Sequence, residues 1–224
     1  MSKKSICLKQ WEIPGLLDGS KTLIVRPITP QPPEGYICAG RLLDTTGHHD
    51  RKNIGKVAFT DLDYKGAHYY RLPFEAGDVL LGRETWRYGD CADKTLAAAQ
   101  NVGCVLEKCD IWQEKYMYYA DDIPCKVYCK WRSPVTMPSE AVRIKLAVRD
   151  VRVLRVQDIT PEQIEALGIK ECTGISSCGG GCVSCYGSRS MLVPRYKSQW
   201  DTDNPKLKWA ENPWIMAVEI ERVV

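Results

Sequence analysis

Residues 143–156 alternate apolar and basic side chains more regularly than any other part of the chain. The apolar members Ile144, Leu146 and Val148 recur at every second position, and the basic residues of the segment are interleaved with its apolar residues: Arg143, Lys145, Arg149, Arg152 and Arg155. Since strand side chains point alternately to opposite faces, this pattern predicts a long β-strand with one apolar and one basic face. The basic face can either track a phosphate backbone or be the solvated outside of a sheet.

Shorter apolar runs, bounded by glycine, proline or acidic turns, predict further strands. They lie at residues 5–8, 21–25, 57–61, 68–72, 79–86, 116–119, 126–131 and 213–223. Thr160 and Pro161 favour the start of a short helix that ends at Gly168. Residues 10–18 predict a helical turn, and 94–100 have good helix propensity. The glycine- and cysteine-rich segment near 170–212 predicts a long excursion.

Many strands and few short helices predict an α+β, mostly β fold, with a β-barrel and loop insertions. The chain has 224 residues, 44% of them hydrophobic, which favours one domain over residues 1–224. We expect the insertions near residues 34–70, 90–125 and 170–212.

A net charge of +3 is only mildly basic, so any contact with nucleic acid should be a local patch. No apolar run predicts an export signal or a membrane span, so we expect a cytoplasmic protein with no membrane partner. The eleven cysteines are then thiols or metal ligands rather than disulfides.

Two short segments carry residues suited to binding an anion or a base. Lys21 and Thr22 follow the Gly19 turn, with Arg26 further along the same run, and such a pair of cations can clamp a phosphate or polarise a carbonyl. The alternative is a solvated lysine and an ordinary arginine ion pair.

The segment 77–86, with sequence GDVLLGRETW, is the second of these. Alternation along a strand places Arg83 and Thr85 on one face and Glu84 and Trp86 on the other. A stacking tryptophan beside charged hydrogen-bonding groups is typical of a nucleobase pocket. The alternative is a core tryptophan with a structural salt bridge. Arg132, which follows Trp131 and precedes the basic strand in the sequence, is a further candidate for contact with a nucleic acid.

These blocks resemble, in the same order, the ASCH domains of the PUA-like superfamily, and among them the branch found in phage and prophage proteins. The resemblance rests on residues 17–26, 77–86, 131–146, 151–168 and 212–223. It implies a PUA-like β-barrel that binds RNA, single-stranded nucleic acid or a modified nucleotide. It also implies a cleft between the lysine turn and the RETW strand, lined by Lys21, Thr22, Arg26, Arg83, Glu84, Trp86 and Arg132.

One ASCH-type family removes an acetyl group from modified cytidine with a lysine, a hydroxyl and a carboxylate. Lys21 matches that lysine, but Ile24 stands at the hydroxyl position, and Leu167 stands where phage relatives often have a glutamate. Both departures argue against that mechanism. A hydrolase acting on RNA or a modified nucleoside, with Lys21 and Glu84 as catalytic candidates, remains the alternative to a binding module. A protein partner, bound through the cysteine-rich loop and the C-terminal tryptophans, is the third hypothesis.

Four cysteines between residues 172 and 185 have the spacing of a metal site. They are Cys172, Cys178, Cys182 and Cys185. Four thiolates satisfy the tetrahedral preference of zinc, and the three glycines among them let the backbone fold tightly. The sequence therefore predicts one structural zinc, with a loop of free thiols or a redox-active disulfide as the alternatives. We expect no organic cofactor.

Overall fold

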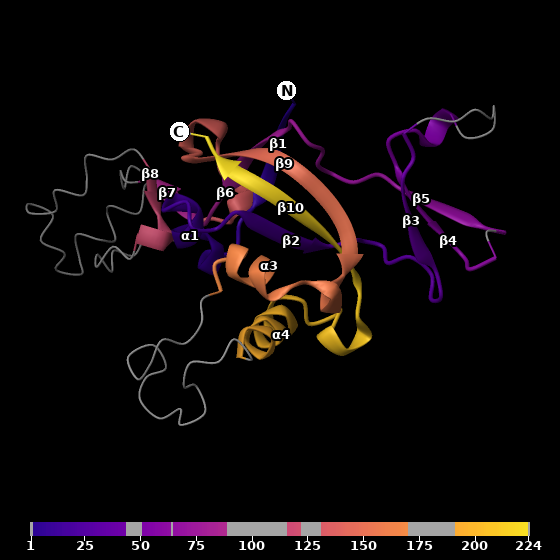
Figure 1. Ribbon diagram of the computed structural model, residues 1–224. Helices are drawn as coiled ribbons and strands as arrows, with labels where there is room; N and C mark the ends of the chain where they lie inside the picture. The colour runs from indigo at the N-terminus through magenta and orange to yellow at the C-terminus, as the bar shows by residue number, and fades with distance from the viewer. Residues whose placement is uncertain are drawn as a thin grey trace, which may run out of the picture. The chain divides into compact units, whose positions relative to one another are not determined.

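The computed structural model describes residues 2–43, 51–63, 65–88, 116–121, 131–169 and 191–223. This part of the chain is a mixed α+β structure, mostly β, with a few short helices, as the sequence predicted (Figure 1). Its strands are β1 Lys3–Cys7, β2 Leu23–Pro27, β3 Ile37–Arg41, β4 Val57–Thr60, β5 Ala67–Tyr70, β6 Val79–Arg83, β7 Trp86–Tyr88, β8 Tyr116–Tyr118, β9 Ile144–Arg155 and β10 Trp214–Arg222. Its α-helices are α1 Ile13–Leu17, α3 Pro161–Ala166 and α4 Leu192–Asp203.

Five of these strands follow the order β1-β6-β9-β10-β2. Strand β1 is parallel to β6, β6 is antiparallel to β9, and β10 is antiparallel to β2. The predicted strand at 143–156 is confirmed as β9, and its alternate side chains Ile144, Leu146 and Val148 are buried. No pairing among the described residues joins β1 to β2, so closure into a barrel stays a prediction.

The chain divides into two compact units, and each is described by itself. Unit 1 comprises Met1–Gly19, Val79–Ala147 and Arg222–Val224. Unit 2 comprises Ser20–Asp78 and Val148–Glu221. The organisation as one domain with three insertions stays a prediction.

In unit 2, helices α3 and α4 pack against β2 and β10 (Figure 1). Helix α3 begins as predicted: the Thr160 side chain accepts from Gln163 N, and the Gln163 side chain accepts from Thr160 N, which forms a capping box. Helix α4 corrects the prediction of an irregular excursion through residue 212. Leu192, Tyr196 and Trp200 recur at every fourth position and bury one stripe of α4, because residues so spaced share a helix face.

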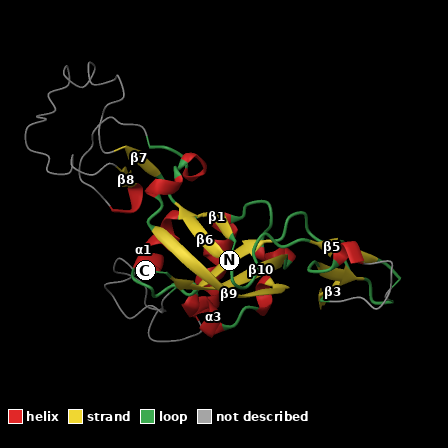
Figure 2. Ribbon diagram, turned by 90° about the horizontal axis from the view of Figure 1, so that it is seen from above, coloured by secondary structure: helices red, strands yellow, loops and turns green. Residues whose placement is uncertain are grey.

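A smaller sheet of unit 2 has the order β3-β4-β5, and Figure 2 shows β3 and β5 in it. The hairpin of β4 and β5 is close to the predicted one, whereas β3 follows the proline-rich loop and was not predicted. Phe59 of β4 packs on Trp214 of β10, with ring centroids 5.1 Å apart. The Gln31 amide hydrogen-bonds both N and O of Trp214, which fixes the proline-rich loop to the start of β10.

In unit 1, the predicted single strand 79–86 is wrong in one respect, because it breaks after Arg83. Strand β6 ends there, and β7 begins at Trp86. Glu84 leaves the ladder: its backbone N–H donates to Met137 Sδ, 3.4 Å away, and its carboxylate binds Arg143. The predicted alternation of side chains between two strand faces is therefore interrupted between Arg83 and Trp86.

Candidate functional site

Strands β7 and β8 form a short antiparallel ribbon in unit 1, and Arg132 adds a third rung. Trp86 pairs with Tyr118, Tyr88 pairs with Tyr116, and the backbone of Trp86 exchanges two hydrogen bonds with that of Arg132. Directly opposed residues of a ladder project to the same face. One face of the ribbon therefore carries four aromatic rings and one guanidinium, and we call these five residues the aromatic face.

Some residues of the aromatic face are buried and others are exposed. Trp86 is 2% exposed and lies edge-on to Tyr88 and Tyr116, at centroid distances of 4.9 and 5.9 Å. Tyr88 is 42% exposed, and the exposed Arg132 guanidinium lies 5.1 Å from its ring centroid. The buried rings of Trp86 and Tyr116 pack on Met137, Ala141 and Val142. The part of the aromatic face that solvent reaches is thus the Tyr88 ring with the Arg132 guanidinium beside it.

A second ring pair lies next to the ribbon. Arg87 lies 4.5 Å from the centroid of the Trp131 ring, and Tyr119 meets that ring edge-on at 5.2 Å. Tyr119 is 51% exposed, and its backbone N–H donates to Thr85 O at 3.0 Å. A guanidinium is attracted to the negative face of a tryptophan ring, and the attraction is stronger at desolvated sites such as that of Arg87, which is 4% exposed.

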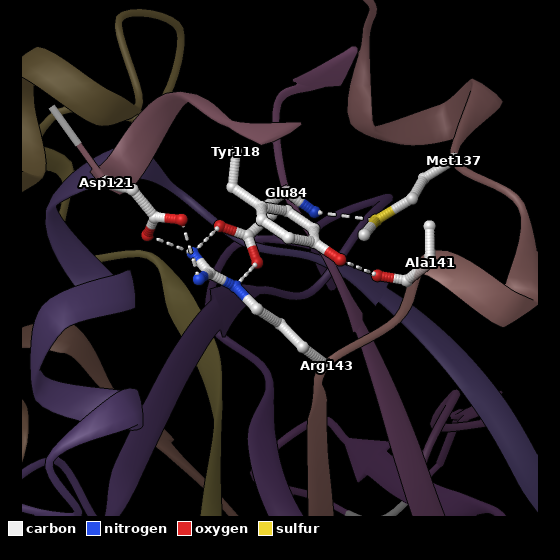
Figure 3. Close-up of polar contacts among 6 residues, drawn as sticks. All are labelled: Glu84, Tyr118, Asp121, Met137, Ala141 and Arg143. Carbon is white, nitrogen blue, oxygen red and sulfur yellow. Dashed lines mark hydrogen bonds and ion pairs between the residues drawn. The ribbon is translucent and has the colours of Figure 1, made fainter. Parts of the chain in front are cut away.

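The Arg143 guanidinium, at the start of β9, binds two carboxylates at once (Figure 3). Its Nε and NH2 donate to the two oxygens of Glu84 at 2.8 and 2.9 Å, and its NH1 and NH2 donate to those of Asp121 at 2.9 and 2.7 Å. We call these three residues the carboxylate clamp. Burial lowers the pKa of Arg143, but the hydrogen bonds and charges of both carboxylates outweigh it, so the pKa is raised above its ordinary value.

An aromatic ring covers the clamp. The centroid of the Tyr118 ring lies 3.9 Å from the Arg143 guanidinium carbon, and the Tyr118 hydroxyl donates to Ala141 O at 2.8 Å (Figure 3). Glu84 beneath it has an exposed fraction of 0%. The clamp therefore holds together the segment after β6, the turn after β8 and the residue that precedes β9.

The predicted anion turn has a different environment, in unit 2. Lys21 is 3% exposed, and its ammonium donates to Leu167 O at 2.7 Å. The backbone N–H of Thr22 donates to Ala166 O at 2.9 Å. Cations are favourable near the last carbonyls of a helix because these carry partial negative charge. Lys21 and Thr22 thus bind the end of α3, where Gly168 takes a φ of 81°.

The two predicted arginines that flank these segments bind backbone carbonyls. Arg26 NH1 donates to Val25 O, and Arg83 NH1 donates to Val135 O, both at 2.9 Å. Lys21, Thr22 and Arg26 belong to unit 2, whereas Arg83, Glu84, Trp86 and Arg132 belong to unit 1. A cleft shared by the two sets stays a prediction.

The basic face of β9 is largely paired with carboxylates. Arg149 binds Glu221, and Arg152 binds both Asp150 and Glu219 at 2.7 Å. These pairs leave little net positive charge along the strand, which favours a solvated outer face over a phosphate track. The arginine–aromatic ribbon is then the stronger candidate for ligand contact.

The cysteines predicted to bind zinc, at positions 172, 178, 182 and 185, lie outside the described residues. Within the described ranges, no group of three or more His, Cys, Asp or Glu side chains could hold a metal ion. In those same ranges no helix is long and apolar enough to cross a membrane.

Sequence reasoning missed most of the exposed members of this site. Tyr88, Tyr119 and Asp121 were not candidates, and Arg143 was assigned only to the basic strand. A signal for them was present: the short segments WRY, YMYY and WR each place aromatic residues together or beside an arginine. The pairing of β8 with β7 brings the first two segments together, and the bridge between Trp86 and Arg132 adds the third.

Comparisons with protein-family models, curated proteins and solved structures found no match to this chain.

Proposed function

We propose that this protein binds single-stranded nucleic acid or a modified nucleotide, with the β7–β8 ribbon as the contact surface. The observation that carries the proposal is the exposed pairing of aromatic rings with arginine at the ribbon. Tyr88 and Tyr119 are 42% and 51% exposed, and Arg132 lies beside Tyr88. Exposed rings next to guanidinium groups suit unpaired bases, which stack on aromatic side chains and on arginine.

Trp86 enters this proposal as a support and not as the stacking residue. With 2% of its surface exposed, its ring offers a base almost no area. It holds Tyr88 edge-on at 4.9 Å instead. Stacking of one base on an accessible ring contributes about 1–3 kcal/mol, so Tyr88 and Tyr119 together supply about 2–6 kcal/mol. Micromolar binding needs about 8 kcal/mol, so contacts between basic side chains and phosphates must supply the rest.

The proposed scaffold is a PUA-like barrel of the ASCH type, as in phage and prophage proteins. Two observations support it: the order of the sequence blocks along the chain, and a mostly β architecture with short helices. A single zinc in the cysteine-rich loop and a cytoplasmic location belong to the same proposal.

The test measures binding of labelled single-stranded RNA and DNA oligonucleotides by fluorescence anisotropy. Salt is kept at about 50 mM, where phosphate contacts are strongest. Tyr88→Ala and Arg132→Ala are each expected to weaken binding about fivefold or more. Arg149→Ala is the matched control, because Arg149 forms an exposed ion pair with Glu221 and lies off the ribbon. Wild-type protein that binds neither oligonucleotide at low salt contradicts the proposal.

A hydrolase has weaker support. Both oxygens of Glu84 accept hydrogen bonds from Arg143, and Lys21 donates to a helix carbonyl. In neither arrangement does the side chain have the geometry expected of a general acid or base, which must reach a proton of the substrate. A nucleoside hydrolysis screen comparing wild type with Lys21→Ala tests this alternative, which fails when both are equally inert.

A further inference from the structure

The carboxylate clamp contains one carboxylate more than charge balance needs. Glu84 is fully buried, so its charge requires a partner, and the bidentate pair with Arg143 already supplies one. The second carboxylate, Asp121, adds a further negative charge to that neutral pair. Its side chain is 34% exposed and could be solvated by water instead. Neutralising a buried charge therefore does not explain Asp121.

What Asp121 does is fix a short turn. It is the last residue of the 3₁₀ turn Tyr119–Asp121, which directly follows β8. At the start of the turn the Tyr119 N–H donates to Thr85 O, and at its end Asp121 accepts two hydrogen bonds from Arg143. The turn is thus tied at both ends. The Tyr119 ring, which packs on Trp131, projects from the tied segment.

Arg143 is itself rigidly held. Glu84 binds two of its nitrogens on one side, and the Tyr118 ring covers its guanidinium at 3.9 Å. A planar guanidinium fixed in this way presents its remaining donors to Asp121 in one geometry (Figure 3). The position of the turn is therefore set by the buried Glu84–Arg143 pair and transmitted through Asp121.

We infer that Asp121 and Arg143 are positioning residues that hold Tyr119 in place to stack on an unpaired base of the ligand. The inference rests on the proposed function. Ordering a ring before the ligand arrives reduces the entropy lost on binding, which is how preorganisation raises affinity. Neither residue needs to touch the ligand for this.

A double-mutant cycle in the full chain tests the inference. It compares wild type, Asp121→Ala, Tyr119→Ala and the double variant, with a labelled single-stranded oligonucleotide as the probe. Asp121→Ala keeps the Glu84–Arg143 pair, so the melting temperature should stay near that of wild type. Each single variant is expected to bind about fivefold to tenfold more weakly than wild type. Coupling energies that correspond to such a factor are ordinary for neighbouring residues. The double variant is expected to bind no more weakly than Tyr119→Ala alone.

Two further variants complete the design. Asp121→Asn keeps the side-chain volume but loses one acceptor, so an intermediate loss is expected. Asp150→Ala is the matched control, because Asp150 also pairs with an arginine, Arg152, and lies away from Tyr119 in sequence. It should leave binding unchanged.

The outcomes separate the inference from the proposed function. Wild-type binding that Asp121→Ala leaves unchanged overturns the inference and leaves the function standing. The same holds when the losses in Asp121→Ala and Tyr119→Ala simply multiply in the double variant, because the two residues then act independently. Wild-type protein that binds no oligonucleotide overturns both.

Discussion

Replacing Lys21 by methionine should destabilise the protein without weakening its binding of an oligonucleotide. Lys21 is 3% exposed, and its ammonium donates to Leu167 O at 2.7 Å. A hydrogen bond from a charged donor contributes about 1.5–3 kcal/mol, and its loss also leaves a buried carbonyl without this donor. We therefore expect a loss of about 2–3 kcal/mol in the free energy of unfolding. For a chain of this size that corresponds to a fall in melting temperature of about 4–12 °C.

Urea denaturation followed by tryptophan fluorescence measures the change in Lys21→Met, and anisotropy at a temperature well below its transition measures binding. Lys145→Met is the control, because Lys145 is exposed on β9 and its replacement should change stability by less than about 0.5 kcal/mol. Lys21→Met with wild-type stability and lost binding would refute this reasoning. It would restore the predicted role of Lys21 in clamping the ligand.

Four other outcomes are expected. The Tyr196 hydroxyl is buried and has no hydrogen-bond partner among the described residues, so Tyr196→Phe should raise the free energy of unfolding by about 1 kcal/mol in urea denaturation, and a destabilised variant contradicts this. Burial raises the pKa of Tyr196, so the folded state holds that proton more tightly than the unfolded state does. The free energy of unfolding should therefore fall as pH rises above about 10, and Tyr196→Phe should reduce that fall. Thr160→Ala should lose about 1 kcal/mol through the cap of α3, whereas Ser198→Ala should not. Elemental analysis should find one zinc per chain, and the zinc should be lost when Cys172, Cys178, Cys182 and Cys185 are replaced by serine. Wild-type protein without metal would argue for free thiols instead.

Local patterns predicted the secondary structure well where one signal dominates. The alternation in 143–156 gives β9, and Thr160 with Pro161 begins α3, because strand periodicity and helix capping act within a few residues. Helix α4 was missed although Leu192, Tyr196 and Trp200 have helical spacing. The glycine, cysteine and asparagine content of its surroundings outweighed that short periodic signal.

The candidate site was predicted only in part, because long-range contacts decide it. Glu84 and Trp86 were predicted to face a ligand, with a core tryptophan and a structural salt bridge as the alternative, and their role in binding stays a prediction. The charged partner of Glu84 is Arg143, and the ring partners of Trp86 include Tyr116 on β8. No local pattern shows which arginine a buried glutamate will meet. Lys21 illustrates the same limit: a glycine turn followed by lysine suits an anion site and the end of a helix equally well.

The pairing of β2 has a consequence for how the chain folds during its synthesis. Strand β2 lies near the start of the chain, yet it pairs with β10 near its end, where Pro27 opposes Ile215. The side chains that bury Leu23 and Val25 also come from the last third of the sequence. During synthesis the apolar side chains of β2 therefore stay exposed until β10 has been made. Nascent chains stalled before β10 should expose β2 and recruit chaperones, whereas chains in which β10 has left the ribosome should not.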